Sequence, residues 1–130
     1  MSESKCILIL SPDEEGRDGI SASMGKFNLD LHCCAGLKDA GALLQRYNYS
    51  VVFCSERLAD GTYADVISAA NPVPVVVFSR LADWRRYLEA LNAGAFDYIA
   101  CPPNTRDINH IIKSTLDKNS CLIAQEAPSR

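Results

Sequence analysis

The sequence predicts an α/β protein, a three-layer sandwich in which helices cover both faces of a five-stranded parallel sheet. Along its 130 residues, five short apolar segments are each followed by an amphipathic segment. Two of the apolar segments, Lys5–Leu10 and 51–54, carry almost no polar residue, which is typical of strands that are buried on both faces. The length fits one domain with a core of its own.

The segment 49–61 (YSVVFCSERLADG) holds the strand around which the others are arranged. Its apolar run, 51–54, predicts the central strand of the sheet. In open α/β sheets ligands bind beyond the carboxyl ends of the strands. Ser55, which directly follows this strand, is therefore predicted to face the functional crevice.

The pattern predicts five strands and five helices in alternation. The predicted strands are Lys5–Leu10, Leu29–Cys34, 51–54, 73–78 and 96–101. The predicted helices are one that ends near Lys26, then 37–47, 62–70, 83–94 and one that begins at Asn104 or Thr105. Leu29–Cys34 alternates in polarity, which suits an edge strand. Right-handed crossovers then favour the flavodoxin-like strand order 2-1-3-4-5.

The fourth predicted helix has clear start and stop signals. Asp83 can cap its first turn, and Gly94 can end it. Helical spacing predicts a core face made of Trp84, Tyr87, Leu88 and Leu91. The helix before it is predicted to end at Asn71, because the residue before a proline disfavours the helical conformation.

Composition and charge exclude several classes of function. A net charge of −3 gives no basic surface for nucleic acid. The apolar runs are too short for a membrane span, and the start MSESK lacks the apolar run of a secretion signal. We therefore expect a cytoplasmic protein that binds neither nucleic acid nor membrane.

The six cysteines predict neither a disulfide scaffold nor a zinc site. There is no CxxC pair, and His32 and His110 are not spaced to complete a four-ligand set. Three of the cysteines, Cys6, Cys33 and Cys54, fall in apolar strand-like segments, where the thiol is expected to act as a small hydrophobic group. We expect all six thiols to be reduced.

Four strand ends are predicted to meet at one crevice. The residues that directly follow the first, third, fourth and fifth strands of the sheet are Ser11, Ser55, Ser79 and Cys101. Ser11, Pro12 and Glu14 are also interpreted as a helix start, with Ser11 as the cap and Glu14 completing a capping box.

Four pieces of the sequence, over about residues 5–118, resemble the receiver domain of bacterial two-component response regulators. These pieces are ILIL-SPDEE, VVFC-SERLADG, VVVFS and GAFDYIACPPN. The resemblance implies a receiver domain at 1–118 and a C-terminal tail at 119–130. It also implies a signalling module and not an enzyme.

The resemblance places a degenerate site on this chain. The family has an acidic pair after the first strand, where this chain has Ser11 and Pro12, with Asp13 and Glu14 one or two places later. The position of the phospho-accepting aspartate is Ser55, and the position of the family's lysine is Cys101. Ser79 alone is retained. By the same analogy Tyr98 is the aromatic switch position, and the Cys101-Pro102 bond is cis.

These substitutions predict a receiver that does not accept phosphate on aspartate. A serine hydroxyl needs an adjacent general base to become a nucleophile, and no histidine maps nearby. Magnesium and other cofactors are not expected; Asp13 is the weak candidate for a ligand. An alternative is that a separate serine kinase phosphorylates Ser55, or that residual Mg²⁺ binding at Asp13 regulates the domain.

The remaining interpretations concern partners and surface groups. The resemblance implies protein partners, namely a histidine kinase, a downstream regulator, or a second copy bound through the fourth helix, fifth strand and fifth helix. The candidate contact residues on that face are Arg85, Arg86, Glu89 and Asp107. Glu56 is predicted to point away from the crevice, and Glu56 and Arg57 are predicted to form a solvated pair in the loop. A flavin carrier is disfavoured by the acidic residues after the first strand, and a redox role for Cys101 is disfavoured because no cation maps nearby.

Overall fold

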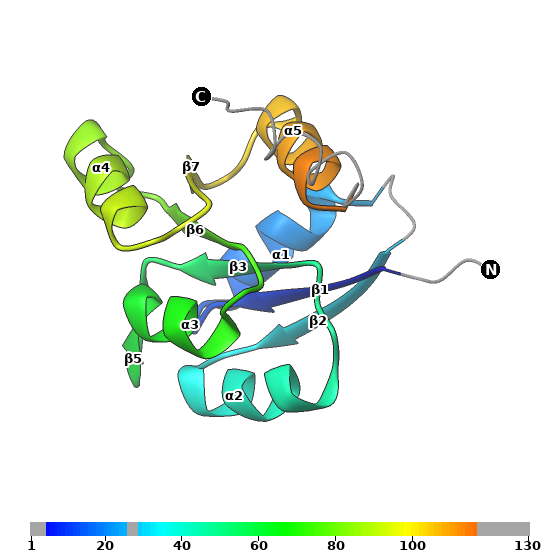
Figure 1. Cartoon of the computed structure of the whole chain (residues 1–130). Helices are drawn as coiled ribbons and strands as arrows, with labels where there is room; N and C mark the ends of the chain where they lie inside the picture. The colour runs from blue at the N-terminus through cyan, green and yellow to red at the C-terminus, as the bar shows by residue number, and fades with distance from the viewer. Residues whose placement is uncertain (1–4, 26–28, 117–130) are drawn as a thin grey trace, which may run out of the picture.

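The protein folds around a five-stranded parallel sheet with the strand order β2-β1-β3-β6-β7 (Figure 1). The structure is a computed structural model that describes residues 5–25 and 29–116. The sheet strands are β1 (Lys5–Leu10), β2 (Leu29–Cys34), β3 (Val51–Ser55), β6 (Val75–Ser79) and β7 (Asp97–Ala100). In chain order these are the first to fifth strands of the sheet, so the predicted order 2-1-3-4-5 is confirmed. The predicted tail, 119–130, lies outside the described residues.

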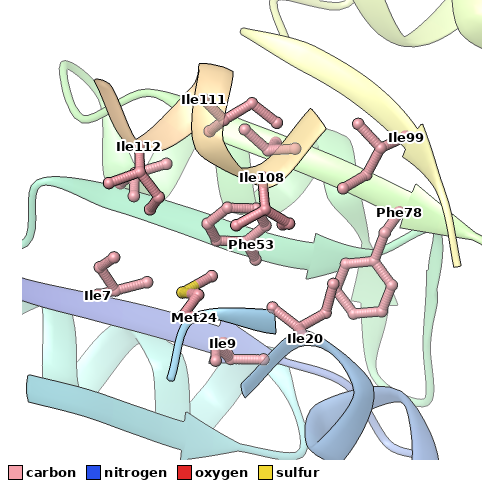
Figure 2. Packing of buried hydrophobic residues seen from close by; sticks show 12 residues of the cluster. Ile7, Ile9, Ile20, Met24, Phe53, Phe78, Ile99, Ile108, Ile111 and Ile112 are labelled. Atoms are coloured by element: carbon pink, nitrogen blue, oxygen red, sulfur yellow. The ribbon is translucent and has the colours of Figure 1, made fainter. Parts of the chain in front are cut away.

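Helices cover both faces of this sheet, as the sequence predicts. They are α1 (Glu14–Ser23), α2 (Leu37–Arg46), α3 (Tyr63–Ala70), α4 (Trp84–Asn92) and α5 (Thr105–Leu116). On one face, Ile20 of α1, Met24 directly after this helix and three isoleucines of α5 join a core cluster around Phe53 (Figure 2). On the other face, α2, α3 and α4 cover the sheet (Figure 1). The core therefore consists of two layers separated by β1, β3 and β6.

A short antiparallel hairpin, β4 (Arg57–Leu58) and β5 (Gly61–Thr62), follows β3 and was not predicted. At its tip, the Asp60 carboxylate accepts hydrogen bonds from the backbone N–H groups of Leu37 (2.8 Å) and Lys38 (3.2 Å). These bonds lower the pKa of Asp60. A Cβ at Gly36 would lie 2.9 Å from an Asp60 oxygen, so a side chain at this position would displace the Asp60 carboxylate. Asp60 thus caps α2 from the hairpin.

Helix α1 begins later than the sequence suggests. The N-cap is Asp13 and the first helical residue is Glu14, so the predicted capping box from Ser11 to Glu14 is wrong. The reason is that the Ser11 N–H still donates to the Cys34 carbonyl (3.0 Å) and so extends the sheet. The helix ends at Ser23, three residues before the predicted end at Lys26, which lies outside the described residues.

The predicted core face of α4 is wrong for two of its four members. Trp84 is 70% exposed and Leu88 is 41% exposed, whereas the buried residue of this helix is Ala90. Helix α4 packs against the edge of the sheet, so the sheet buries only a narrow strip of the helix surface. The capping predictions are confirmed: Asp83 accepts a hydrogen bond from the Arg86 N–H (2.8 Å), and Gly94 has a φ of +110°.

Edge position also explains smaller differences from the prediction. Cys33 in the edge strand β2 is exposed, although Cys54 in the central strand is buried as predicted. Phe96 is 44% exposed because β7 begins one residue later, at Asp97.

Two further predictions concern single residues near the end of the chain. Cys121 lies outside the described residues. The Cys101-Pro102 peptide bond is cis, as the family resemblance implies.

We predict that Phe53→Ala lowers the free energy of unfolding by about 3–5 kcal/mol, because Phe53 is fully buried and its removal leaves a cavity. Urea denaturation followed by circular dichroism measures this. Phe96→Ala removes the same atoms from a half-exposed position and is the matched control, with an expected loss of about 1 kcal/mol or less. Equal losses in the two variants would contradict the assigned core.

Candidate functional site

The carboxyl ends of the sheet strands surround an open hollow of about 370 Å³. Ser11, Ser55, Ser79 and Cys101 all line it, so the predicted convergence of these four strand ends is confirmed. Asp13 lines it as well, whereas Glu14, Tyr98 and Pro102 are not among its lining residues. The lining residues that the sequence did not single out for this hollow are Gly16, Glu56, Arg57, Phe78, Arg80, Leu81 and Arg86.

The serine hydroxyls of the hollow differ in availability. Ser11 is 1% exposed, and its Oγ donates to the Asp13 carbonyl and accepts from the Asp13 N–H, both at 3.1 Å. Ser79 Oγ accepts from the Leu81 N–H at 3.0 Å, which shapes the loop after β6. Ser55 is half-buried at the end of β3. Two of the three hydroxyls therefore serve local turns.

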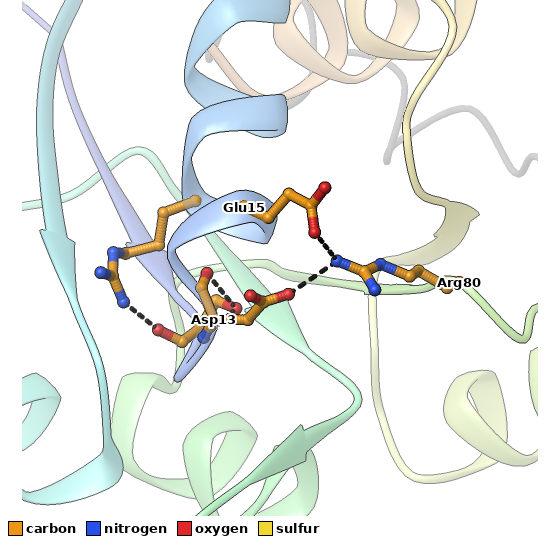
Figure 3. A network of polar contacts seen from close by, with 5 residues as sticks. Asp13, Glu15 and Arg80 are labelled. Carbon is orange, nitrogen blue, oxygen red and sulfur yellow. Dashed lines mark hydrogen bonds and ion pairs between the residues drawn. The ribbon is translucent and has the colours of Figure 1, made fainter.

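Arg80, the residue immediately after β6, pairs with two acidic residues that follow β1. One guanidinium nitrogen of Arg80 lies 2.8 Å from Asp13 Oδ2 and 2.7 Å from Glu15 Oε1, as Figure 3 shows. These side chains are 47–81% exposed, so each pair contributes only about 0–1 kcal/mol to stability. The effect is therefore mainly on charge: Asp13 carries its counterion within the chain.

The residues at the hollow do not fit a magnesium ion. Mg²⁺ prefers carboxylate oxygens in octahedral geometry. Asp13 already pairs with Arg80, and the residue at the end of β3 is a serine. Within the described ranges, 5–25 and 29–116, no three His, Cys, Asp or Glu residues are grouped so as to hold a metal ion.

The prediction for the direction of the Glu56 side chain is wrong. Glu56 was predicted to face away from the crevice, yet it lines the hollow and its side chain is only 15% exposed. Its Oε2 accepts from Arg86 Nη1 at 2.9 Å, and its Oε1 accepts from the Tyr98 hydroxyl at 3.0 Å. The prediction assumed that strand alternation continues, but β3 ends at Ser55 and the chain bends at Glu56. We call Glu56, Arg86 and Tyr98 the Glu56 network.

Cys101 lies beside a cation, which the sequence interpretation did not foresee. Burial nevertheless raises the pKa of the Cys101 thiol, and the opposing effect of Arg80 is smaller. The thiol is therefore protonated at neutral pH, which does not favour the reactive thiolate of a redox sensor.

Comparison with solved structures identifies the fold. The structure superimposes on a CheY-like response regulator receiver domain protein from Methanospirillum hungatei with a TM-score of 0.76, at 23% identity, covering 91% of this chain and 98% of the other. A putative response regulator from Chloroflexus aurantiacus gives 0.79 at 15% identity, covering 88% and 99%. The fold is therefore the flavodoxin-like fold of receiver domains.

Sequence relatives agree with the fold, although no protein-family model matches the chain. The chain is 27% identical over 132 residues to the response regulator protein PilR of Pseudomonas aeruginosa, covering 98% of this chain and 29% of PilR. It is 27% identical over 118 residues to the regulatory protein AtoC of Escherichia coli, covering 88% of this chain and 26% of AtoC. The chain spans less than a third of either relative. The chain is thus similar in sequence to part of two response-regulator proteins and similar in fold to receiver domains.

We predict that millimolar MgCl₂ produces no saturable change in the fluorescence of Trp84, the single tryptophan of the chain, because Arg80 already neutralises Asp13. Isothermal titration calorimetry provides a second measurement. Arg80→Ala is the informative variant, since it releases both carboxylates, and Arg85→Ala is the control for loss of an exposed arginine. Tight binding of Mg²⁺ to the unaltered chain would contradict this prediction.

We predict that Glu56→Gln lowers the pKa of Tyr98. That pKa is raised from 10 to about 12, mainly by burial, and the bond and charge of Glu56 act in the same direction. The stabilisation linked to this shift is present below pH 10 and is lost as the pH rises towards 12. Tyrosine ¹³Cζ shifts measure the titration, with Tyr98→Phe to assign the signal and Glu15→Gln as the charge control. An unchanged Tyr98 titration in Glu56→Gln would contradict the contribution assigned to Glu56.

Proposed function

We propose that the chain is a receiver-like signalling module that does not accept phosphate on aspartate and acts through protein contacts. The observation that carries this proposal is the position of Ser55 at the carboxyl end of β3, where the hollow would need a carboxylate nucleophile. Cys101, a neutral thiol after β7, stands at the position that the family resemblance assigns to a lysine. Neither residue supplies the charge needed to attack or hold a phosphoryl group.

The surroundings of Ser55 support this proposal. A serine becomes nucleophilic only with a base beside it. Glu56, its neighbour, already accepts hydrogen bonds from Arg86 and Tyr98. The imidazole of His32 contacts Tyr49 (2.6 Å from Nδ1 to the hydroxyl), a residue outside the lining of the hollow. On this arrangement Ser55 stays a protonated hydroxyl.

The partners belong to the proposal as well. They are a histidine kinase, a downstream regulator or a second copy, bound at the face formed by α4, β7 and α5. Arg85 and Glu89 are exposed there, together with the apolar Trp84 and Leu88. Arg86 is withdrawn as a contact residue because its guanidinium pairs with Glu56. A cytoplasmic location and the absence of contacts with nucleic acid or membrane remain part of the proposal; within the described residues, no helix has both the length and the apolar character to span a membrane.

We predict that incubation with acetyl phosphate and Mg²⁺ adds no phosphoryl group to the chain, because the hollow offers no carboxylate at the end of β3. Intact-mass spectrometry measures this, with an active receiver domain treated in parallel. Beryllofluoride should likewise leave Trp84 fluorescence unchanged. Ser55→Ala reports any background labelling elsewhere. A hydroxylamine-labile phosphoryl adduct on the unaltered chain would contradict the proposal.

A second candidate function is control by phosphorylation of Ser55 through a serine kinase. Ser55 is half-buried and lines the hollow together with Arg57, Arg80 and Arg86, whose charges suit a phosphate ester. This candidate predicts acid-stable phosphate on Ser55 in protein isolated from its own cells, which peptide mass spectrometry detects. Residual Mg²⁺ regulation at Asp13 is the remaining alternative, and the Mg²⁺ titration above tests it.

A further inference from the structure

Glu56 contacts three separate elements of the fold, one through its backbone and two through its carboxylate. Its backbone N–H donates to the Phe78 carbonyl at 2.9 Å, which attaches it to β6 just beyond the end of β3. Its two carboxylate oxygens are then used separately, one by Arg86 of α4 and the other by Tyr98 of β7. The anion is therefore held at its backbone and bound at both oxygens.

The Glu56 network is better shielded from water than the other ion pairs at the hollow. The side chains of Glu56 and Arg86 are 15% and 30% exposed, whereas Arg80 and its two acidic partners are 47–81% exposed. Tyr98 is 6% exposed. Charge-assisted hydrogen bonds are stronger where the solvent is excluded, and a lost partner then leaves a costly unpaired charge. Of these ion pairs, the Arg86–Glu56 pair is therefore the one expected to control conformation.

A row of aromatic rings leads from this network to the surface. The rings of Tyr98 and Tyr87 make a T-shaped contact, with ring centroids 6.4 Å apart. Tyr87 stacks on Trp84, with centroids 5.3 Å apart and an interplanar angle of 19°. Trp84 is 70% exposed. Two contacts thus hold the first turn of α4: the ion pair of Arg86 with Glu56 and the ring contact of Tyr87 with Tyr98.

We propose that Glu56 is a positioning residue, a built-in anion that holds α4 and its exposed aromatic surface in one arrangement without any covalent modification. Neutralising Glu56 leaves Arg86 only its longer contact with Asp83, 3.6 Å from Nε to Oδ2 within α4 and its cap, and weakens the hold on Tyr98. Because neither remaining contact joins α4 to the end of β3, the Trp84 surface gains a second arrangement. This goes beyond the proposed function, because it concerns which conformation the domain holds and not whether it accepts phosphate.

Fluorine NMR of the full chain labelled with 5-fluorotryptophan tests this proposal, since Trp84 is the single tryptophan. The unaltered chain should give one resonance. Glu56→Gln should shift that resonance or split it into two, and Tyr98→Phe should change it in the same direction. Glu15→Gln makes the same charge change in the exposed Arg80 cluster and should leave it unaltered.

The outcomes separate a positioning role from a merely structural one. If Glu56→Gln is folded by circular dichroism and keeps the original resonance, the proposal is wrong, even if the variant is less stable. Two exchanging resonances in the unaltered chain would also overturn it. If Glu56→Gln does not fold, Tyr98→Phe decides, since it removes one hydroxyl only, and an unchanged resonance there refutes the proposal. No phosphate donor is present, so failure here is independent of the phosphorylation test.

Discussion

Burial of β3 on both faces is the constraint on which the rest of the structure depends. Val51, Val52, Phe53 and Cys54 are all fully buried, with their side chains divided between the two helical layers. β1 and β6 pair with β3 on either side in parallel register, so their carboxyl ends meet beside it. The hollow is therefore a consequence of core packing, and its lining is decided by whichever residues follow the strands.

Charge at this hollow is balanced inside the chain. The arginines of the segment that leads from β6 into α4 reach in two directions: Arg80 contacts Asp13 and Glu15 in the loop after β1 and in α1, and Arg86 contacts Glu56 after β3. An anionic ligand would have to compete with these carboxylates for the two arginines. If it bound both arginines, Asp13, Glu15 and Glu56 would lose their counterions. The exposed Arg80 pairs are easily broken, whereas the shielded Arg86 pair is not. The two arginines thus contribute differently to the charge of the hollow: Arg80 through exposed pairs and Arg86 through a shielded one.

The sequence predicted the scaffold well because the scaffold depends on local signals. Apolar runs identified β1 and β3, alternating polarity identified β2 as an edge strand, and Asp83 and Gly94 marked the ends of α4. Convergence of Ser11, Ser55, Ser79 and Cys101 followed from topology alone. The exposed face of α4 was missed because helical spacing shows which residues share a face and not how much of that face a neighbour covers.

The contacts of the charged residues could not be predicted, because they depend on where the regular structure stops. Glu56 would face away from the crevice if β3 continued for one more residue, but the bend after Ser55 turns its carboxylate towards Arg86, thirty residues later. A similar long-range contact joins Asp60 to the first turn of α2. Such pairs form because a flexible charged side chain at a strand end binds a partner group that lies close in space. The sequence pattern does not give the distance between the two groups. The same property lets a single carboxylate take over a positioning role in a hollow whose strand ends carry hydroxyls and a thiol.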